Sequence, residues 1–197
     1  IYNLILNFPD GTNLGYGDEG NGGKKTADRY PQLSRWFDDR TLEYIRTFGT
    51  SGIKPEWTSY SFPLSQTTIM RSDWSKQALY MFTNVRGGGG GHGHGDDNHL
   101  SVYAFGRVLL ADSGVFSYTS TDPYRQWGLS SKAHNTVLIN NSNQTIQPVS
   151  QKAGVGTIHH WHTNNSYDFL SQSTNATKNF KHKRTISFIK PYYWIVS

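Results

Sequence analysis

The chain has 197 residues, a formal net charge of +5 and no cysteine, and 35% of its residues are hydrophobic. It is long enough to bury a sizeable core. Disulfides and thiolate metal sites are excluded, so a metal would be held by His and carboxylate side chains. The positive charge favours an acidic partner. Because Lys and Arg are scattered rather than massed, an acidic polysaccharide is favoured over nucleic acid. No apolar run approaches membrane-spanning length, so membrane insertion is not expected.

The first 50 residues combine a glycine-rich loop with a helical pattern. FPDGTNLGYGDEGNGGKK, residues 8–25, carries a Pro-Asp-Gly turn signal and is predicted to be a loop. Residues 28–48 carry apolar side chains at roughly helical spacing. The apolar start lacks an initiator Met, and Ser197 follows the apolar string YYWIV. We therefore expect the chain to be a fragment of a larger protein.

From Thr67 onward the sequence indicates β-structure. TTIMRSDWSKQALYMFTNV predicts strand, turn and strand, and SVYAFGRVLLADSGVFSY predicts two buried strands around a turn at Gly106-Arg107. A further strand is expected at residues 136–139. FKHKRTISFIKPYYWIV predicts two strands around a turn at Lys190-Pro191. The prolines and short polar residues of 49–65 are typical of a connection into this β-domain.

A cluster of ionisable side chains follows five consecutive glycines at residues 87–91. Its members are His92, His94, Asp96, Asp97 and His99. Glycine permits sharp turns and close backbone approach, so we expect the run at a sheet edge or over a cleft rather than as a flexible tether. In an extended chain the H-x-H spacing places both imidazoles on one face, close enough to share a site.

Two more side chains are candidates for a third metal ligand. Asp112 ends the apolar run VLLA, where an unpaired buried carboxylate would be costly. His134 precedes the strand expected at residues 136–139. Any one histidine alone is more often an ordinary polar residue. The second cluster, His159, His160 and His162, is interpreted as strand-surface residues.

The motifs MRSDW, GHGHGDDN, YAFGRVLLADSGVFSY and AHNTV occur in that order, before a closing RTISFIKPYYWIV. Together they resemble the heparinase II/III-like domain of bacterial polysaccharide lyases, chiefly over residues 62–144. The resemblance implies a mainly β fold, an antiparallel β-sandwich preceded by a short helical remnant of an (α/α) toroid. Residues 1–50 would then be the end of the toroid domain with a cleft loop, and residues 51–197 the sandwich. In that family the cleft between the two domains cuts uronate-containing polysaccharides by β-elimination.

The same resemblance implies roles for four residues. His92 matches the catalytic histidine, and His94, Asp112 and His134 match the ligands of a structural zinc. Histidine side chains titrate near neutral pH and so suit proton transfer. The zinc would hold the loop so that His92 stays oriented. An alternative is that His92 and His94 chelate one metal, whose bound water reacts.

Four further side chains are candidates for substrate binding. Arg71 and Arg125 would bind a carboxylate or sulfate of the substrate through bidentate contacts. The alternative for each is an ion pair with a nearby Asp. Trp127 would stack on a sugar face, the alternative being a core position. Tyr16, with Asp18, would contact sugar from the predicted loop, the alternative being an ordinary surface loop.

Three classes of function remain open from the sequence. The first is a polysaccharide lyase, the second a non-catalytic carbohydrate-binding or structural β-sandwich, and the third a metal-dependent glycan hydrolase. For a lyase we expect the missing N-terminal toroid to supply the group that neutralises the uronate and the acid or base opposite His92. The 197-residue piece alone is then expected to be inactive. A bacterial periplasmic or secreted location is expected.

Overall fold

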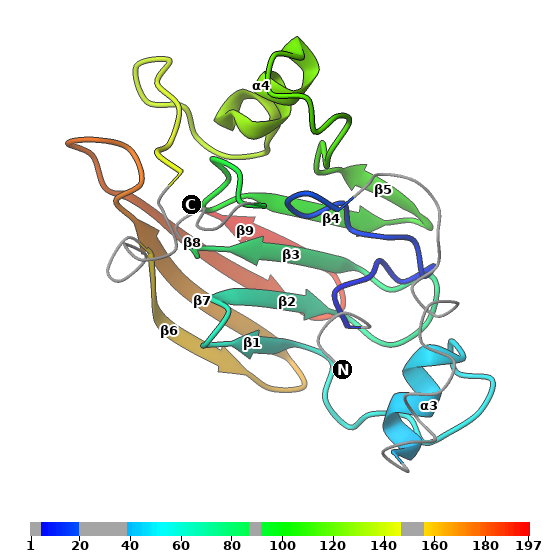
Figure 1. Ribbon diagram of the computed structural model, residues 1–197. Coiled ribbons are helices and arrows are strands. Elements are labelled where there is room, and N and C mark those ends of the chain that lie inside the picture. Colours follow the sequence, from blue (N-terminus) through cyan, green and yellow to red (C-terminus); the bar gives the residue numbers. More distant parts are fainter. Residues whose placement is uncertain (1–4, 20–38, 87–91, 147–155) are drawn as a thin grey trace.

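Two antiparallel sheets form the described part of the protein, which in this computed structural model comprises residues 5–19, 39–86, 92–146 and 156–197 (Figure 1). The five-stranded sheet has the order β1-β2-β3-β4-β5 and comprises Tyr60–Phe62, Thr67–Arg71, Tyr80–Asn84, Leu100–Ala104 and Arg107–Leu110. The four-stranded sheet has the order β6-β7-β8-β9 and comprises Gly156–Thr163, Tyr167–Thr174, His182–Ile189 and Tyr193–Val196. Every neighbouring pair is adjacent in sequence. The predicted mainly β, antiparallel sandwich is confirmed.

The space between the two sheets is filled by one apolar cluster. Along a strand successive side chains point to opposite faces, so alternate residues reach this interface. The five-stranded sheet contributes Met70, Met81, Leu100 and Val102, and the four-stranded sheet contributes Leu170, Ile186 and Phe188. Their burial against one another fixes the two sheets face to face.

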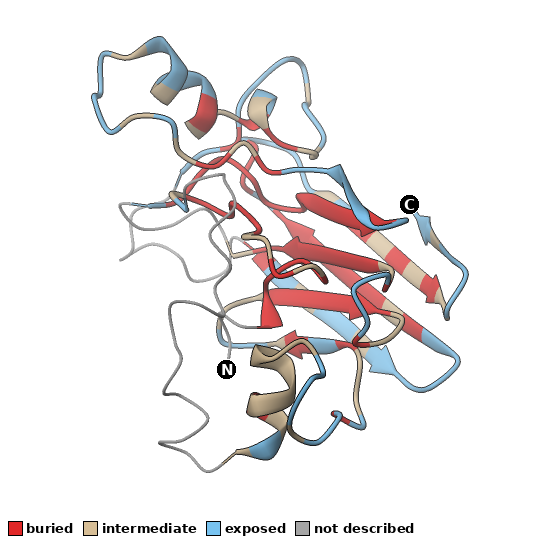
Figure 2. Ribbon diagram, turned by 90° about the vertical axis from the view of Figure 1, so that its right-hand side faces the viewer, coloured by how far each residue is buried: buried red, intermediate tan, exposed pale blue. Residues whose placement is uncertain are grey.

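The outer face of the five-stranded sheet is also buried. There the intervening residues Ile69, Tyr80, Phe82 and Tyr103 pack against a segment comprising residues 5–16. Figure 1 shows this N-terminal segment in dark blue beside the sheet, and Figure 2 shows the central strands as buried. Strands β2, β3 and β4 are consequently buried on both faces. This packing brings the loop at residues 13–19 beside the end of β3.

Helices are few and short. Helix α3, Arg40–Arg46, starts at an N-cap where the Asp39 carboxylate accepts hydrogen bonds from the Thr41 and Leu42 amides. It lies within the predicted helical stretch, of which residues 28–38 are outside the described part. Helix α4, Pro123–Leu129, has Asp122 as its N-cap and is followed by the 3₁₀ turn η2, Ser131–Ala133. No helix among the described residues is long and apolar enough to cross a membrane.

Three local predictions were wrong: the burial of the strand after Gly106, the position of the turn before that strand, and the strand at residues 136–139. Strand β5 is exposed along its whole length because it is the edge of its sheet and nothing covers it among the described residues. The turn before it is Phe105-Gly106, both at positive φ, rather than Gly106-Arg107. Residues 136–139 form no strand, and only an isolated bridge joins Ile139 to Ser142. The glycine run at residues 87–91 lies outside the described residues.

Other local predictions are confirmed. The strand–turn–strand pattern of residues 67–84 corresponds to β2 and β3, and the closing pattern corresponds to β8 and β9. His159, His160 and His162 lie on β6 with exposed side chains, as expected of strand-surface residues. Nothing in their arrangement gathers them into a site.

The inter-sheet cluster leads to a prediction about stability. Leu170→Ala should lower the free energy of unfolding by about 2–5 kcal/mol, because it leaves a cavity at a fully buried position. The matched control is Leu64→Ala, which deletes the same atoms from a fully exposed position and should change stability by less than about 0.5 kcal/mol. Urea denaturation of both variants measures the difference, and equal losses would contradict the assigned core.

Candidate active site and metal centre

His92 and Asp18 meet where the loop after β3 approaches the N-terminal segment. The His92 Nδ1 lies 2.9 Å from the Asp18 Oδ2, and the imidazole is otherwise 77% exposed. With the Nδ1 proton directed to the carboxylate, the Nε2 of His92 carries the lone pair. Within the described residues that nitrogen has no hydrogen-bond partner, so it is available to solvent or to a ligand.

The Asp18 carboxylate is enclosed by three cationic or proton-donating side chains. Its side chain is only 3% exposed, and both its oxygens accept hydrogen bonds from the Arg125 guanidinium in a bidentate pair. The His94 Nε2 lies 3.0 Å from its Oδ1. Burial alone would raise the pKa of Asp18, but the hydrogen bonds from Arg125, His94 and His92 hold it well below its usual range. Asp18 is therefore ionised.

A depression of about 350 Å³ adjoins His92 and Asp18. It is lined by Tyr16, Arg86 and Tyr118, with Leu6 and Glu19 completing its wall. The Arg86 guanidinium lies 4.4 Å above the Tyr16 ring. The Tyr118 ring meets the His92 imidazole edge-on, with 6.4 Å between ring centroids. A cation, two aromatic rings and an accessible imidazole thus surround one open space.

Three buried side chains form a separate group deeper in the protein. His94, Asp112 and His134 each offer one ligand atom, and these atoms all lie within 4.8 Å of one another. None of the three lies within a strand. His94 lies in the loop before β4, Asp112 follows β5, and His134 follows η2.

Hydrogen bonds to the remote ring nitrogens decide which atoms face the centre of this group. The His94 Nε2 is bonded to Asp18, and the His134 Nε2 donates to the Gly128 carbonyl over 3.0 Å. Each Nδ1 of a neutral imidazole then carries a lone pair. The His134 Nδ1 lies 3.3 Å from the Asp112 Oδ2, and the buried His94 Nδ1 has no hydrogen-bond partner among the described residues. Lone pairs converging in this way fit a cation.

A third buried histidine, His99, lies next to Asp112 of this group. The His99 Nδ1 accepts a hydrogen bond from the backbone N–H of Asn135 over 3.0 Å, so the proton of the neutral ring is on Nε2. This Nε2 donates to the Ser101 hydroxyl and lies 3.4 Å from the Asp112 Oδ2. Burial lowers the pKa of His99 to about 4, which keeps it neutral. The pKa of Asp112 is lowered despite its burial, because His134 and His99 face it.

The loop that carries His92 and His94 is fastened at its far end to the second sheet. Asn98 adopts a positive φ of 61°, which Asn tolerates, and its side chain donates to the His182 carbonyl over 3.0 Å. Gln172 of β7 donates to the Asn98 side chain over 2.8 Å. The Thr174 hydroxyl donates to Asp97. This anchoring explains why a loop with so many polar residues is buried.

Two of the four candidate substrate-binding residues lie at the depression or against Asp18. Tyr16 lines the depression and packs on Phe82, and its hydroxyl accepts a hydrogen bond from Asn84 over 3.1 Å. Arg125 forms the ion pair with an Asp that the sequence left as an alternative to substrate binding.

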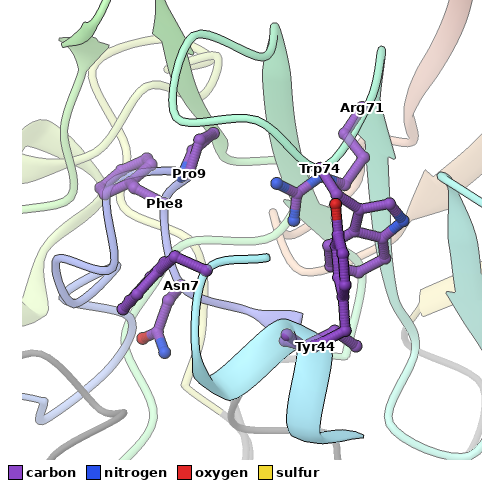
Figure 3. A pocket seen from close by; sticks show the side chains of 8 residues that line it. Asn7, Phe8, Pro9, Tyr44, Arg71 and Trp74 are labelled. Atoms are coloured by element: carbon purple, nitrogen blue, oxygen red, sulfur yellow. The ribbon is translucent and has the colours of Figure 1, made fainter. Parts of the chain in front are cut away.

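The other two lie elsewhere. Arg71 is buried in a small separate pocket, where its guanidinium lies 4.1 Å from the Trp74 ring, near Phe8 and Tyr44 (Figure 3). Burial lowers the pKa of Arg71 to about 10. Trp127 is 46% exposed on α4, where it lines an apolar hollow with Phe116, Pro123 and Tyr124.

The sequence did not identify the central role of Asp18. It suggested a sugar contact, whereas the carboxylate faces inward and joins groups 74 to 107 residues away. The loop sequence GYGDEG marks a turn but contains no sign of its partners. Arg86 and the supporting role of His99 were also missed. The alternative in which His92 and His94 chelate one metal is not supported, since among the described residues the ligand group contains His94 but not His92.

Most of the chain is similar to known proteins. The sequence profile of the family described as heparinase II/III-like, C-terminal, matches residues 55–197. A heparin-sulfate lyase of Pedobacter heparinus is 25% identical over 85% of the chain, and one of Bacteroides stercoris is 26% identical over 100% of it. A solved structure of heparinase III, the BT4657 gene product, is 26% identical and covers 98% of the chain with a TM-score of 0.85.

The chain spans only part of these relatives. It covers 26% and 29% of the length of the two lyases and 30% of the solved heparinase III. The resemblance first suggested by the ordered motifs is confirmed by the profile match and by the shared fold. This chain belongs to the heparinase II/III-like, C-terminal family.

Proposed function

We propose that this chain is the C-terminal sandwich of an enzyme that cleaves a uronate-containing acidic polysaccharide by β-elimination. The observation that carries the proposal is His92, whose imidazole stands exposed beside the depression while its Nδ1 is bonded to an ionised carboxylate. The names of the relatives make heparan sulfate the first substrate to test. The net charge of +5 suits a polyanion. In this proposal residues 1–50 end a toroid domain and residues 51–197 form the sandwich.

The elimination requires two proton transfers and no added water. A base removes the proton at C5 of the uronate, the C4–O4 bond breaks, and a C4–C5 double bond forms as O4 leaves with a proton. His92 would carry one of these protons on its Nε2, because its Nδ1 is held by Asp18 and the exposed nitrogen faces the solvent side. Arg86, lining the same depression, offers a cation for the substrate carboxylate or a sulfate.

We also propose that His94, Asp112 and His134 hold a structural zinc ion. The donor set of two imidazoles and one carboxylate is one that zinc accepts, with water as a fourth ligand. Each imidazole bonds its second nitrogen to a carboxylate or a carbonyl, as ligating histidines commonly do. The ion would compensate the Asp112 charge in the protein interior. His92 stands outside this set, which favours a structural over a catalytic role.

Incubation of the full-length protein with heparan sulfate, alginate and hyaluronan tests the proposed reaction. The double bond conjugated with the uronate carboxylate absorbs in the near ultraviolet, so a lyase produces rising absorbance with at least one of them. Chain shortening without absorbance would instead indicate the metal-dependent hydrolase. Binding without shortening would indicate a non-catalytic carbohydrate-binding sandwich.

The apolar hollow around Trp127 leads to a prediction about substrate affinity. Exposed aromatic rings stack on sugar faces, and the hollow combines Trp127 with Tyr124 and Phe116 on and beside the helix that also carries Arg125. Trp127→Ala in the full-length protein should raise KM by about tenfold, equivalent to about 1.4 kcal/mol of binding, and leave kcat nearly unchanged. The control is Tyr192→Ala, an exposed aromatic outside the hollow. Equal KM values for both variants would contradict a stacking role.

A further inference from the structure

We infer that Asp18 is a positioning residue that couples the metal centre to His92. One carboxylate contacts both histidines, with its Oδ2 2.9 Å from the His92 Nδ1 and its Oδ1 3.0 Å from the His94 Nε2. His94 belongs to the ligand group, whereas His92 does not. Asp18 therefore joins a metal ligand to the proposed proton-transfer group through two hydrogen bonds. The inference rests on the proposed function for His92, but the contact with His94 stands without it.

The two hydrogen bonds select opposite tautomers of neighbouring histidines. Both Asp18 oxygens already accept hydrogen bonds from the Arg125 guanidinium, so the carboxylate acts as an acceptor and each imidazole presents an N–H to it. For His92 this places the proton on Nδ1 and leaves the exposed Nε2 as the lone-pair nitrogen. For His94 it places the proton on Nε2 and leaves the buried Nδ1 for the metal. A single carboxylate thus prepares one ring for proton transfer and the other for ligation.

The surroundings hold Asp18 in this bridging position. The Arg125 guanidinium binds both its oxygens, and the Arg125 position is in turn fixed over the Tyr118 ring at 5.2 Å. The backbone at Gly17 packs closely against the backbone at His92, because a Cβ added to Gly17 would lie 2.8 Å from the His92 carbonyl oxygen. Gly17 also has a φ of +63°, which favours glycine. The Tyr118 hydroxyl contacts the Asp18 carbonyl over 3.5 Å. The N-terminal loop and the histidine loop are therefore fitted to each other at this residue.

Asp18→Asn in the full-length protein is the direct test, because it keeps the size of the side chain but removes the charge and one acceptor. We expect kcat to fall by about 100-fold with little change in KM, as for a misplaced catalytic group. We also expect metal affinity, measured by competition with a chelator, to fall by about 10–100-fold. Asp10→Asn is the matched control, since it removes the same charge from the same N-terminal segment at a turn with Thr12.

Combination with His92→Ala separates coupling from a general structural effect. If Asp18 acts through His92, the double variant should lose no more kcat than His92→Ala alone, while its metal affinity should match that of Asp18→Asn. A double variant whose kcat loss is the product of the two single-variant losses would overturn the inference. An Asp18→Asn variant with wild-type kcat and wild-type metal affinity would overturn it as well. If the wild-type protein forms no unsaturated product, the proposed function fails. The chelator competition then still decides whether Asp18 supports His94, and unchanged affinity would overturn that link.

Discussion

Replacing His92 by Ala in the full-length protein should lower kcat on a cleaved polysaccharide by about 100- to 10,000-fold. In the proposed reaction the exposed imidazole exchanges a proton at the depression, and its removal leaves Tyr16, Arg86 and Tyr118 in place. The side chain is 77% exposed and lies outside the metal-ligand group, so metal content and melting temperature should stay nearly unchanged. Steady-state kinetics, elemental analysis and thermal unfolding give the three readouts.

A matched histidine controls for nonspecific effects of this change. His160 is exposed on β6, away from the ligand group, and His160→Ala should keep wild-type kcat, metal content and melting temperature. Loss of metal in His92→Ala would contradict the separation of the catalytic and structural roles. A wild-type kcat in that variant would contradict its role in proton transfer.

Replacing His94 by Ala should strongly lower the stability of the protein and its metal content. The variant should lose the metal and lower the free energy of unfolding by about 3–5 kcal/mol, because Asp112 remains buried without its cation and Asp18 loses one hydrogen bond. Asp112 is 2% exposed and His94 is 0% exposed, so water cannot readily replace the lost interactions. Denaturant unfolding and elemental analysis measure both losses.

Metal removal from the wild-type protein provides the matching comparison. A strong chelator should lower wild-type stability towards that of His94→Ala and should have little further effect on the variant. Wild-type metal content in the variant, or a chelator effect equal in both proteins, would contradict ligation by His94.

The sequence predicted the parts of the fold that depend on local patterns. Strands β2 and β3 carry the consecutive apolar residues Ile69-Met70 and Tyr80-Met81-Phe82 on either side of a polar turn, and both faces of each strand are buried. Strand β5 has an equally apolar run, RVLL, but its exposure depends on its place at the sheet edge. Edge position is a property of the whole sheet, so the apolar run alone predicted burial wrongly.

The candidate site was accessible from sequence where the ordered motifs carry it. His92 and His94 stand out by their spacing, Asp112 and His134 were candidates within the later motifs, and the fold brings both of them to His94. Asp18 was not accessible in this way. Its partners lie in a loop and on helix α4, far along the chain, and the sequence around Asp18 shows only glycines and a turn. A carboxylate that bridges two distant loops becomes visible only in three dimensions.

The reaction itself is tested most directly by the origin of the oxygen in the product. Full-length protein should cleave heparan sulfate in water enriched in heavy oxygen, and the products should be analysed by mass spectrometry. β-Elimination predicts fragments whose masses sum to that of the substrate, with a double bond at the new non-reducing end and no labelled oxygen gained in the cleavage step. Incorporation of one labelled oxygen per cleavage, without the double bond, would show hydrolysis and contradict the proposed reaction.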